Sequence, residues 1–202
     1  MPDGSKTATP TIEREVLWTG IGGQGVQLAA KILALAATHD GREVMSLGTY
    51  GGTMRGGNTD ATIVVADGPI TSPPMVSHAW SAVIAHPRYF EPIRPKLRAG
   101  GLVVVDADLL DEPLPKTPAD MLSISATTLA READAPKAAA LVLLGAFAGA
   151  TGIVSADSLD KALAASLPSY RSQFLESNQR ALETGFAALP ALSTPAWAKE
   201  AA

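Results

Sequence analysis

The spacing of hydrophobic and polar positions predicts strands alternating with helices in the first half of the chain and helices alone near its end. Short apolar runs rich in β-branched residues are typical of buried strands. Such runs predict strands at 15–19, 43–47, 59–66, 81–85, 102–106 and 121–124. Longer apolar or amphipathic segments predict helices at 26–38, 89–98, 126–133, 138–150, 155–167 and 172–189. This order indicates an α/β, Rossmann-like three-layer fold with a mainly parallel sheet and a helical C-terminal third.

The first three elements form a unit of strand, glycine turn, helix and strand. This order predicts two parallel strands joined by a right-handed crossover. The glycine-dense stretch 48–58 that follows is interpreted as an irregular loop. Residues 1–13 are expected to be a flexible arm, residues 14–189 a single domain, and residues 190–202 a C-terminal tail.

Composition excludes several classes of protein. The 202 residues carry a net charge of −4, so no basic field is available to bind nucleic acid. The chain has no cysteine, which excludes disulfides, thiolate zinc sites and cysteine-ligated iron–sulfur clusters on it. The apolar stretch 138–154 contains glycines and is shorter than the roughly 20 residues of a membrane span. No signal peptide is visible either, so we expect a cytoplasmic protein without a membrane span.

The first glycine loop follows the first strand. Gly20, Gly22 and Gly25 have the dinucleotide-binding G-x-G-x-x-G spacing, between a strand and a helix. Glycines allow a tight turn, and the start of the helix offers free N–H groups to an anion. A site for NAD usually has an acidic residue at the end of the second strand, and positions 46–48 contain none. The alternative is that the glycines only permit close packing of strand and helix.

Other catalytic patterns are absent from the sequence. There is no phosphate-binding G-x-x-x-x-G-K-[ST], no G-x-S-x-G and no H-E-x-x-H, and His39, His78 and His86 lack metal-ligand spacing. Asp106 and Asp108 follow a predicted strand and would face the ligand edge of the sheet. Acidic residues at that position serve equally well as helix caps.

The second glycine loop places one arginine, Arg55, among four glycines at 51, 52, 56 and 57. Without neighbouring side chains, its guanidinium and the backbone amides could converge on a phosphate or a carboxylate. A solvated arginine on a surface loop is the alternative. Because this loop also follows a strand, we expect it at the same sheet edge as the first.

The two loops together carry a resemblance. G-I-G-G-Q-G-V at 20–26 and Y-G-G-T-M-R-G-G-N at 50–58, about thirty residues apart, resemble the γ subunit of the 2-oxoacid:ferredoxin oxidoreductases. That family includes pyruvate, 2-oxoglutarate, 2-oxoisovalerate, indolepyruvate and phenylglyoxylate oxidoreductases. The resemblance covers about residues 14–187 and continues through 67–70, 100–106, 144–146 and 178–185.

The resemblance implies a division of labour. Enzymes of this family cleave a 2-oxoacid with thiamine diphosphate and Mg²⁺, and transfer the acyl group to coenzyme A. Electrons pass through [4Fe–4S] clusters to ferredoxin or, through a flavin subunit, to NAD. These groups belong to α-, β- and δ-type partner subunits, so the resemblance implies a γ chain with no catalytic residue, metal or cofactor of its own.

Nine residues of the glycine loops are the candidate contacts to coenzyme A or to a partner subunit. They are Gly22, Gly23, Gln24, Gly25, Tyr50, Arg55, Gly56, Gly57 and Asn58. Two alternative functions stay open at this point. One is a free-standing NAD(P)-binding oxidoreductase that uses the first loop, and the other is a structural scaffold without ligand contacts.

Overall fold

A six-stranded mixed sheet forms the centre of the computed structural model, which describes residues 11–50, 56–71, 73 and 75–198. The strand order is β2-β3-β1-β4-β5-β6. The strands are β1 (Glu13–Ile21), β2 (Glu43–Tyr50), β3 (Asn58–Ala66), β4 (Ser81–Ile84), β5 (Leu102–Asp106) and β6 (Asp120–Ile124). Strands β1, β4, β5 and β6 pair in parallel, whereas β3 is antiparallel to both β1 and β2. The α/β class and the mainly parallel sheet are therefore confirmed.

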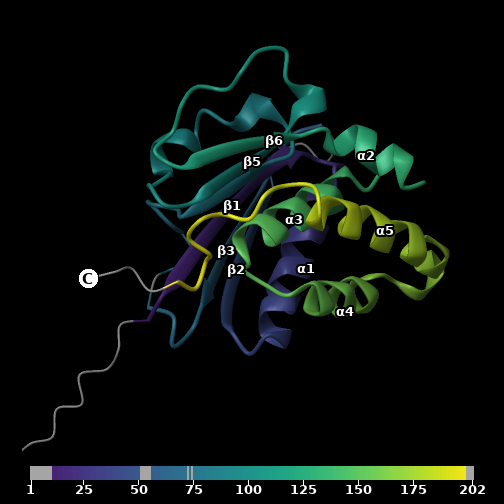
Figure 1. The fold of residues 1–202 in the computed structure, drawn as a ribbon, viewed down its shortest axis with the longest axis horizontal. Helices are drawn as coiled ribbons and strands as arrows, with labels where there is room; N and C mark the ends of the chain where they lie inside the picture. Colours follow the sequence, from purple (N-terminus) through teal and green to yellow (C-terminus); the bar gives the residue numbers. More distant parts are fainter. Residues whose placement is uncertain (1–10, 51–55, 72, 74, 199–202) are drawn as a thin grey trace, which may run out of the picture.

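Strand β3 adds a feature that the sequence did not predict, although β1 and β2 run in the same direction as expected. The helix α1 (Val26–His39) does connect β1 to β2, but these two strands do not pair, because β3 lies between them (Figure 1). After β2 the chain reverses its direction. Strand β3 then lies beside β1 and forms backbone hydrogen bonds with β1 on one side and β2 on the other. The predicted loop 48–58 is correspondingly shorter, since β2 extends to Tyr50 and β3 begins at Asn58.

The helices lie on one side of the sheet in two tiers (Figure 1). Helices α1 and α3 (Ala139–Thr151) pack on the strands, α4 (Ala156–Ser166) packs on α1, and α5 (Leu175–Phe186) packs on α3. The short α2 (Ala126–Glu132) contacts α3 and α5. The opposite sheet face is covered by irregular chain that carries buried Phe90, Ile93 and Leu97. The helical C-terminal third is confirmed.

Two predicted helices differ from the structure. Segment 89–98 contains the 3₁₀ turns η1 (Pro87–Tyr89) and η2 (Arg94–Lys96) in place of a helix, because prolines at 92 and 95 cannot donate the backbone hydrogen bonds that an α-helix needs. The predicted helix 172–189 begins later, as α5, after the 3₁₀ segment η4 (Ser169–Phe174). A third short turn, η3 (Ala107–Leu109), follows β5.

Helix α3 is the buried centre of the helical layer. All but two of its residues are buried, and the ring of Phe147 meets Trp80 edge-on with 6.2 Å between centroids. Its contact with α5 depends on three glycines. A Cβ atom at Gly145 would collide with the carbonyl oxygen of Leu182, one at Gly149 with that of Phe186, and one at Gly185 with that of Val142. The two helix backbones therefore touch, which only glycine permits.

The ends of the described chain are attached to the domain. Glu13, in the predicted arm, begins β1, and the segment 190–198 packs against the end of α3. The Ala196 N–H donates to the Thr151 oxygen at 2.8 Å, while Arg14 Nε donates to the Ala196 oxygen at 2.6 Å. Within the described residues, no helix is both long and apolar enough to cross a membrane.

Asp40, at the C-terminal end of α1, connects this helix to the start of α4. Its carboxylate accepts hydrogen bonds from the Ser155 N–H at 2.7 Å, the Ser155 hydroxyl at 2.8 Å and the Ser158 hydroxyl at 2.6 Å. Ser155 also caps α4, as the sequence predicts. Partial burial opposes ionisation of Asp40, but hydrogen bonds from Ser158 and Ser155, with the nearby Arg42, hold its pKa below the ordinary value.

We expect Gly145→Ala to lower the free energy of unfolding by about 1 to 3 kcal/mol, because the added methyl group forces α3 and α5 apart. Denaturant unfolding followed by circular dichroism measures this change. Glu183→Ala, on the exposed face of α5, is the control and should change stability by less than about 0.5 kcal/mol. Equal midpoints for wild type and Gly145→Ala would contradict the close contact.

We expect the stability advantage of wild type over Asp40→Asn to depend on pH. Because folding lowers the pKa of Asp40, the carboxylate stabilises the fold above its ordinary pKa of about 4, and this contribution is lost as pH falls through the folded-state value. Thermal unfolding of both proteins from about pH 3 to about pH 7 tests this. A constant difference in melting temperature over that range would contradict it.

Candidate functional site

The two glycine loops lie side by side at one edge of the sheet. The register pairs Ile21, the last residue of β1, with Asn58, the first residue of β3, and pairs Thr59 with Tyr50 at the end of β2. The Gly22 N–H donates to the Gly57 oxygen at 2.9 Å, so the loops are joined directly. The expectation that both loops share one edge is confirmed for their described residues.

Left-handed backbone shapes the turn from β1 into α1. Gly23 has φ 105° and Gly25, the N-cap of α1, has φ 87°, conformations that residues with a side chain rarely adopt. No side chain caps the helix. The first N–H groups of α1 therefore point out of the helix without a side-chain acceptor, at its positive dipole end.

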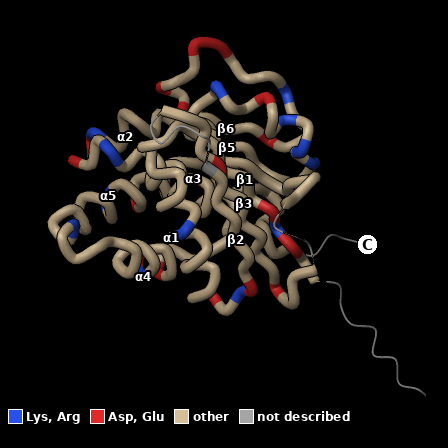
Figure 2. The backbone as a smooth tube through the Cα atoms, turned by 180° about the vertical axis from the view of Figure 1, so that it is seen from behind, with Lys and Arg blue, Asp and Glu red and all other residues tan. Residues whose placement is uncertain are grey.

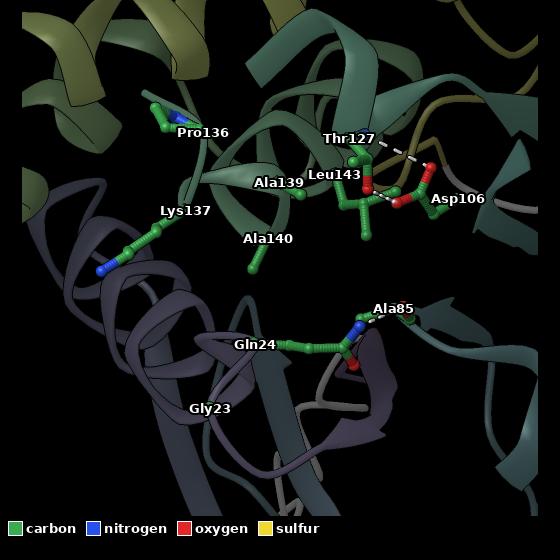
Figure 3. A pocket seen from close by; sticks show the side chains of 10 residues that line it. All are labelled: Gly23, Gln24, Ala85, Asp106, Thr127, Pro136, Lys137, Ala139, Ala140 and Leu143. Atoms are coloured by element: carbon green, nitrogen blue, oxygen red, sulfur yellow. Dashed lines mark hydrogen bonds between the residues drawn. The ribbon is translucent and has the colours of Figure 1, made fainter. Parts of the chain in front are cut away.

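Gln24 holds this turn in place. Its side-chain oxygen accepts a hydrogen bond from the Ile21 N–H at 2.7 Å, and its side-chain nitrogen donates to the Ala85 oxygen at 3.2 Å (Figure 3). Ala85 follows β4, so Gln24 connects the first loop to the next parallel strand. Both polar atoms of Gln24 are thus used within the chain, which makes it a residue that positions the loop.

Asn58 belongs to a second polar network at the same edge. Its side-chain nitrogen donates to Asp60 Oδ2 at 2.7 Å. The buried Thr19 hydroxyl lies 2.6 Å from Asp60 Oδ1 and 3.3 Å from Asn58 Oδ1. Gln27, on α1, donates to the Asp60 backbone oxygen at 2.7 Å. These bonds fix β3 against β1 and α1 close to the glycine loops.

A pocket of about 250 Å³ opens beside the first loop (Figure 3). The start of α1 lies on one side of it and the start of α3 on the other, and a Cβ atom at Gly25 would stand 3.5 Å from the Cβ of Ala140. The N-cap of α3, Ala138, likewise provides no side-chain cap. The lining residues are Gly23, Gln24, Ala85, Asp106, Thr127, Pro136, Lys137, Ala139, Ala140 and Leu143.

Asp106 lies at the inner wall of the pocket and is only 1% exposed. Its Oδ1 accepts hydrogen bonds from the Ala126 and Thr127 N–H groups at 3.0 and 3.4 Å, and its Oδ2 accepts one from the Thr127 hydroxyl at 2.6 Å. It also accepts from the Asp108 N–H at 3.2 Å. Asp106 is therefore the cap of α2, and Asp108 binds the Thr128 N–H at 2.6 Å. Both acids have the capping role that the sequence left open.

The described members of the predicted site lie together. Gly22, Gly23, Gln24 and Gly25 are joined to Gly56, Gly57 and Asn58 through the bond between the loops. Tyr50 ends β2, and only its backbone is described. Arg55 lies outside the described residues, so its contacts with this edge stay a prediction.

The histidines do not form a site. His39 ends α1, His78 contacts the Ser77 hydroxyl, and His86 accepts a hydrogen bond from the Arg88 N–H at 3.2 Å before η1. Over the described ranges, no three His, Asp or Glu side chains are grouped so that they could hold a metal ion.

Sequence reasoning missed the far wall of the pocket. Thr127, Lys137 and Ala140 come from the starts of α2 and α3, more than one hundred residues after the first glycine loop. They carry no motif, because single residues at the starts of helices have no characteristic spacing in the sequence. In a fold whose parallel strands alternate with helices, several helices begin at the same edge of the sheet. This rule was the one signal in the sequence that could have indicated the far wall.

Comparisons with known proteins place the chain among oxidoreductase subunits. Residues 15–188 match the family model described as pyruvate ferredoxin/flavodoxin oxidoreductase. The chain is 33% identical over 160 residues to the 2-oxoglutarate synthase subunit KorC of Methanocaldococcus jannaschii, covering 78% of this chain and 85% of that one. It is 32% identical over 155 residues to the pyruvate/ketoisovalerate oxidoreductases common subunit gamma of Thermococcus litoralis, covering 74% and 84%.

The fold has a close match among solved structures. The keto/oxoacid ferredoxin oxidoreductase gamma subunit of Geobacter sulfurreducens superposes with a TM-score of 0.75 at 28% identity. The alignment covers 86% of this chain and 94% of that one. The similarity therefore extends over nearly the whole domain.

We expect Asp106→Ala to lower the free energy of unfolding by about 1 to 3 kcal/mol, because buried N–H groups at the start of α2 lose their acceptor. Asp106→Asn keeps a side-chain oxygen and should lose less. Denaturant unfolding of the isolated chain measures both changes. Wild-type stability in Asp106→Ala would contradict the capping role and return Asp106 to the candidates for chemistry.

Proposed function

The chain belongs to the pyruvate ferredoxin/flavodoxin oxidoreductase family, and we propose that it is the γ-type subunit of a multi-subunit 2-oxoacid:ferredoxin oxidoreductase. The observation that carries this proposal is the extent of the family match. It runs from the first strand to the end of α5 and so includes both glycine loops, the pocket and α3. The relatives named as gamma or KorC subunits are covered to 84% and 85% of their length, so the likeness is to whole subunits.

In the proposed complex, a 2-oxoacid loses carbon dioxide, its acyl group is transferred to the thiol of coenzyme A, and two electrons pass to ferredoxin or, through a flavin subunit, to NAD. Thiamine diphosphate with Mg²⁺ and [4Fe–4S] clusters supply the carbanion and electron-transfer chemistry on the α-, β- and δ-type partners. Because this chain has no cysteine, thiolate ligands for the clusters have to come from those partners. The proposal includes a cytoplasmic location.

The sheet edge that carries the two glycine loops is the proposed contribution of this chain to an active site shared with its partner subunits. A Cβ atom at Gly23 would meet nothing within 4 Å, so the backbone is open there, and the uncapped start of α1 presents N–H donors to a negatively charged group. The phosphates of coenzyme A or a carboxylate of a partner would both be suitable. In this proposal Tyr50, Arg55, Gly56, Gly57 and Asn58 complete the contact surface, and Arg55 supplies the positive charge.

The side chains at this edge support a role without catalysis. Gln24, Asp60 and Asp106 have polar side chains near the loops or the pocket, and each is engaged in hydrogen bonds within the chain. In this proposal the chain offers backbone donors for binding, while Asp60 and Asp106 hold strands and helices in place.

The free-standing NAD(P) reading has less support from the geometry. In a dinucleotide-binding unit the second strand lies beside the first and places an acid near the ribose. Here β3 separates β1 from β2, and the Asp60 carboxylate on β3 is held by Thr19 and Asn58. Titration of the isolated chain with NADH separates the readings, since micromolar binding would favour the dehydrogenase.

We expect the isolated chain to show no turnover with any 2-oxoacid and no iron–sulfur absorption, and to restore activity when combined with its partner subunits.

In that reconstituted complex, Arg55→Ala should weaken assembly or coenzyme A-dependent turnover by at least about tenfold, because truncating one partner of a buried charged contact costs about 2 to 5 kcal/mol. Arg55→Lys should recover part of the loss, since lysine lacks the planar fork. Size-exclusion chromatography and steady-state kinetics provide the two readouts.

Robust turnover by the chain alone would overturn the subunit assignment. Wild-type assembly and kinetics in Arg55→Ala would keep the subunit assignment but make Arg55 a solvated loop residue. The folded state of each variant is checked by thermal unfolding, which should be unchanged.

A further inference from the structure

The sheet is open at β2. Strand order places β2 at one edge, with β3 on its inner side and no strand of the described chain on its outer side. The strand is eight residues long, and residues 44–50 include no charge and no proline (Figure 2). Edge strands usually carry charges, prolines or bulges that prevent pairing with another chain. A long uncharged edge with free backbone donors and acceptors is suited to the addition of another strand.

Exposed apolar side chains flank this edge on the sheet face away from α1. Met45 and Leu47 are 36% and 38% exposed, although both are large and apolar. Leu47 lines a groove of about 410 Å³ together with Met75, which is 78% exposed, and the buried Ile93. An added strand would bury its own alternate side chains in this groove.

A second groove lies on the other face of the same edge. It measures about 320 Å³ and runs between β2 and the exposed side of α1, where Ala34 and Leu35 face Val44. Gln27 lies against Gly48, and Lys31 is one helical turn further along α1, close to Ser46 at the middle of the strand. The edge therefore has a recess on each face, as an inserted strand with side chains on both faces requires.

An exposed lysine lies beside each of the two grooves. Lys31 lines the α1 groove and Lys96 lines the groove near Met75. Both are exposed, and among the described residues neither makes an ion pair. Two acids are near: Glu43 at the first position of β2, and Asp60, whose carboxylate accepts hydrogen bonds from Thr19 and Asn58. Asp60 lines the same groove as Lys96, but its carboxylate already accepts two hydrogen bonds, and none of the residues that line the groove beside Lys31 is acidic. This arrangement favours an occupant with acidic side chains, above all beside Lys31.

A second copy of the chain fits this edge poorly. Antiparallel pairing of two β2 strands about Ser46 would bring the Lys31 of each copy to the same side of the joined sheet, near the symmetry axis. Two ammonium groups would then face one another, and none of the residues that line this groove is acidic. The charge pattern favours a different chain.

We propose that β2 is a docking edge at which an extended, acidic segment of a partner subunit adds as a further strand of the sheet. The inserted segment places apolar side chains against Leu47 and Met75 and acidic side chains near Lys31 and Lys96. This inference rests on the proposed function, because it takes the partner from the same oxidoreductase complex.

Hydrogen exchange in the reconstituted complex tests the docking edge. We expect backbone amides of β2 to exchange at least about tenfold more slowly in the complex than in the isolated chain, since strand addition protects outward N–H groups. The amides of β6, the strand at the other edge, serve as the internal control and should change little.

Substitutions give a second readout of the same complex. Leu47→Glu and the double variant Lys31→Glu/Lys96→Glu should each weaken assembly at least about tenfold, with unchanged thermal unfolding of the isolated chain. Phe174→Glu and Lys116→Glu are the matched controls, since both residues are exposed away from β2, and should assemble as wild type.

Three outcomes would overturn the docking edge. Assembly with unprotected β2 amides and wild-type behaviour of the variants would reject it while the subunit function stands. Protection of β2 in the isolated chain together with a dimer mass would identify a second copy as the occupant. Failure of the unaltered chain to assemble would reject the subunit function and this interface together.

Discussion

The placement of one antiparallel strand, β3, between two strands of common direction organises the sheet edge at which the two glycine loops meet. A direct pairing of β1 with β2 would leave the second glycine loop at the outside of the sheet. With β3 between them, the ends of β1 and β2 and the start of β3 meet at one edge, and the register sets Ile21 against Asn58 and Tyr50 against Thr59. The hydrogen bond from Gly22 to Gly57 is a consequence of that register.

The helical layer supplies the other wall of the pocket and contains a close contact between α3 and α5. Helix α3 is almost entirely buried, because it packs on the sheet and on α5. Glycines at 145, 149 and 185 allow the backbones of α3 and α5 to touch. The start of α3 faces the start of α1 across the pocket.

Polar side chains near the edge are used to build it. Gln24 ties the first loop to the end of β4, Asp106 caps α2, and Asp60 joins Thr19 to Asn58. Carboxylates held by several donors are poor candidates for proton transfer, whereas glycine backbone and open helix starts are good binding surfaces. This combination agrees with the proposed role of a subunit that completes a site shared with other chains. The unprotected strand β2 at the outside of the sheet agrees with a domain that is finished by its partners.

The sequence by itself determined the class of fold, most strand and helix positions, and the family, since these follow from local hydrophobic patterns and from short glycine motifs such as 20–26 and 50–58. It also indicated the cap at Ser155, which depends only on neighbouring residues. The sequence could not reveal that β3 separates β1 from β2, because pairing partners are chosen by competition between whole strands. Nor could it assign Asp106 to α2 rather than to chemistry, since its acceptor atoms meet N–H groups twenty residues away. The far wall of the pocket was likewise decided by tertiary structure, because helix starts without motifs acquire a role only when packing brings them to the glycine loop.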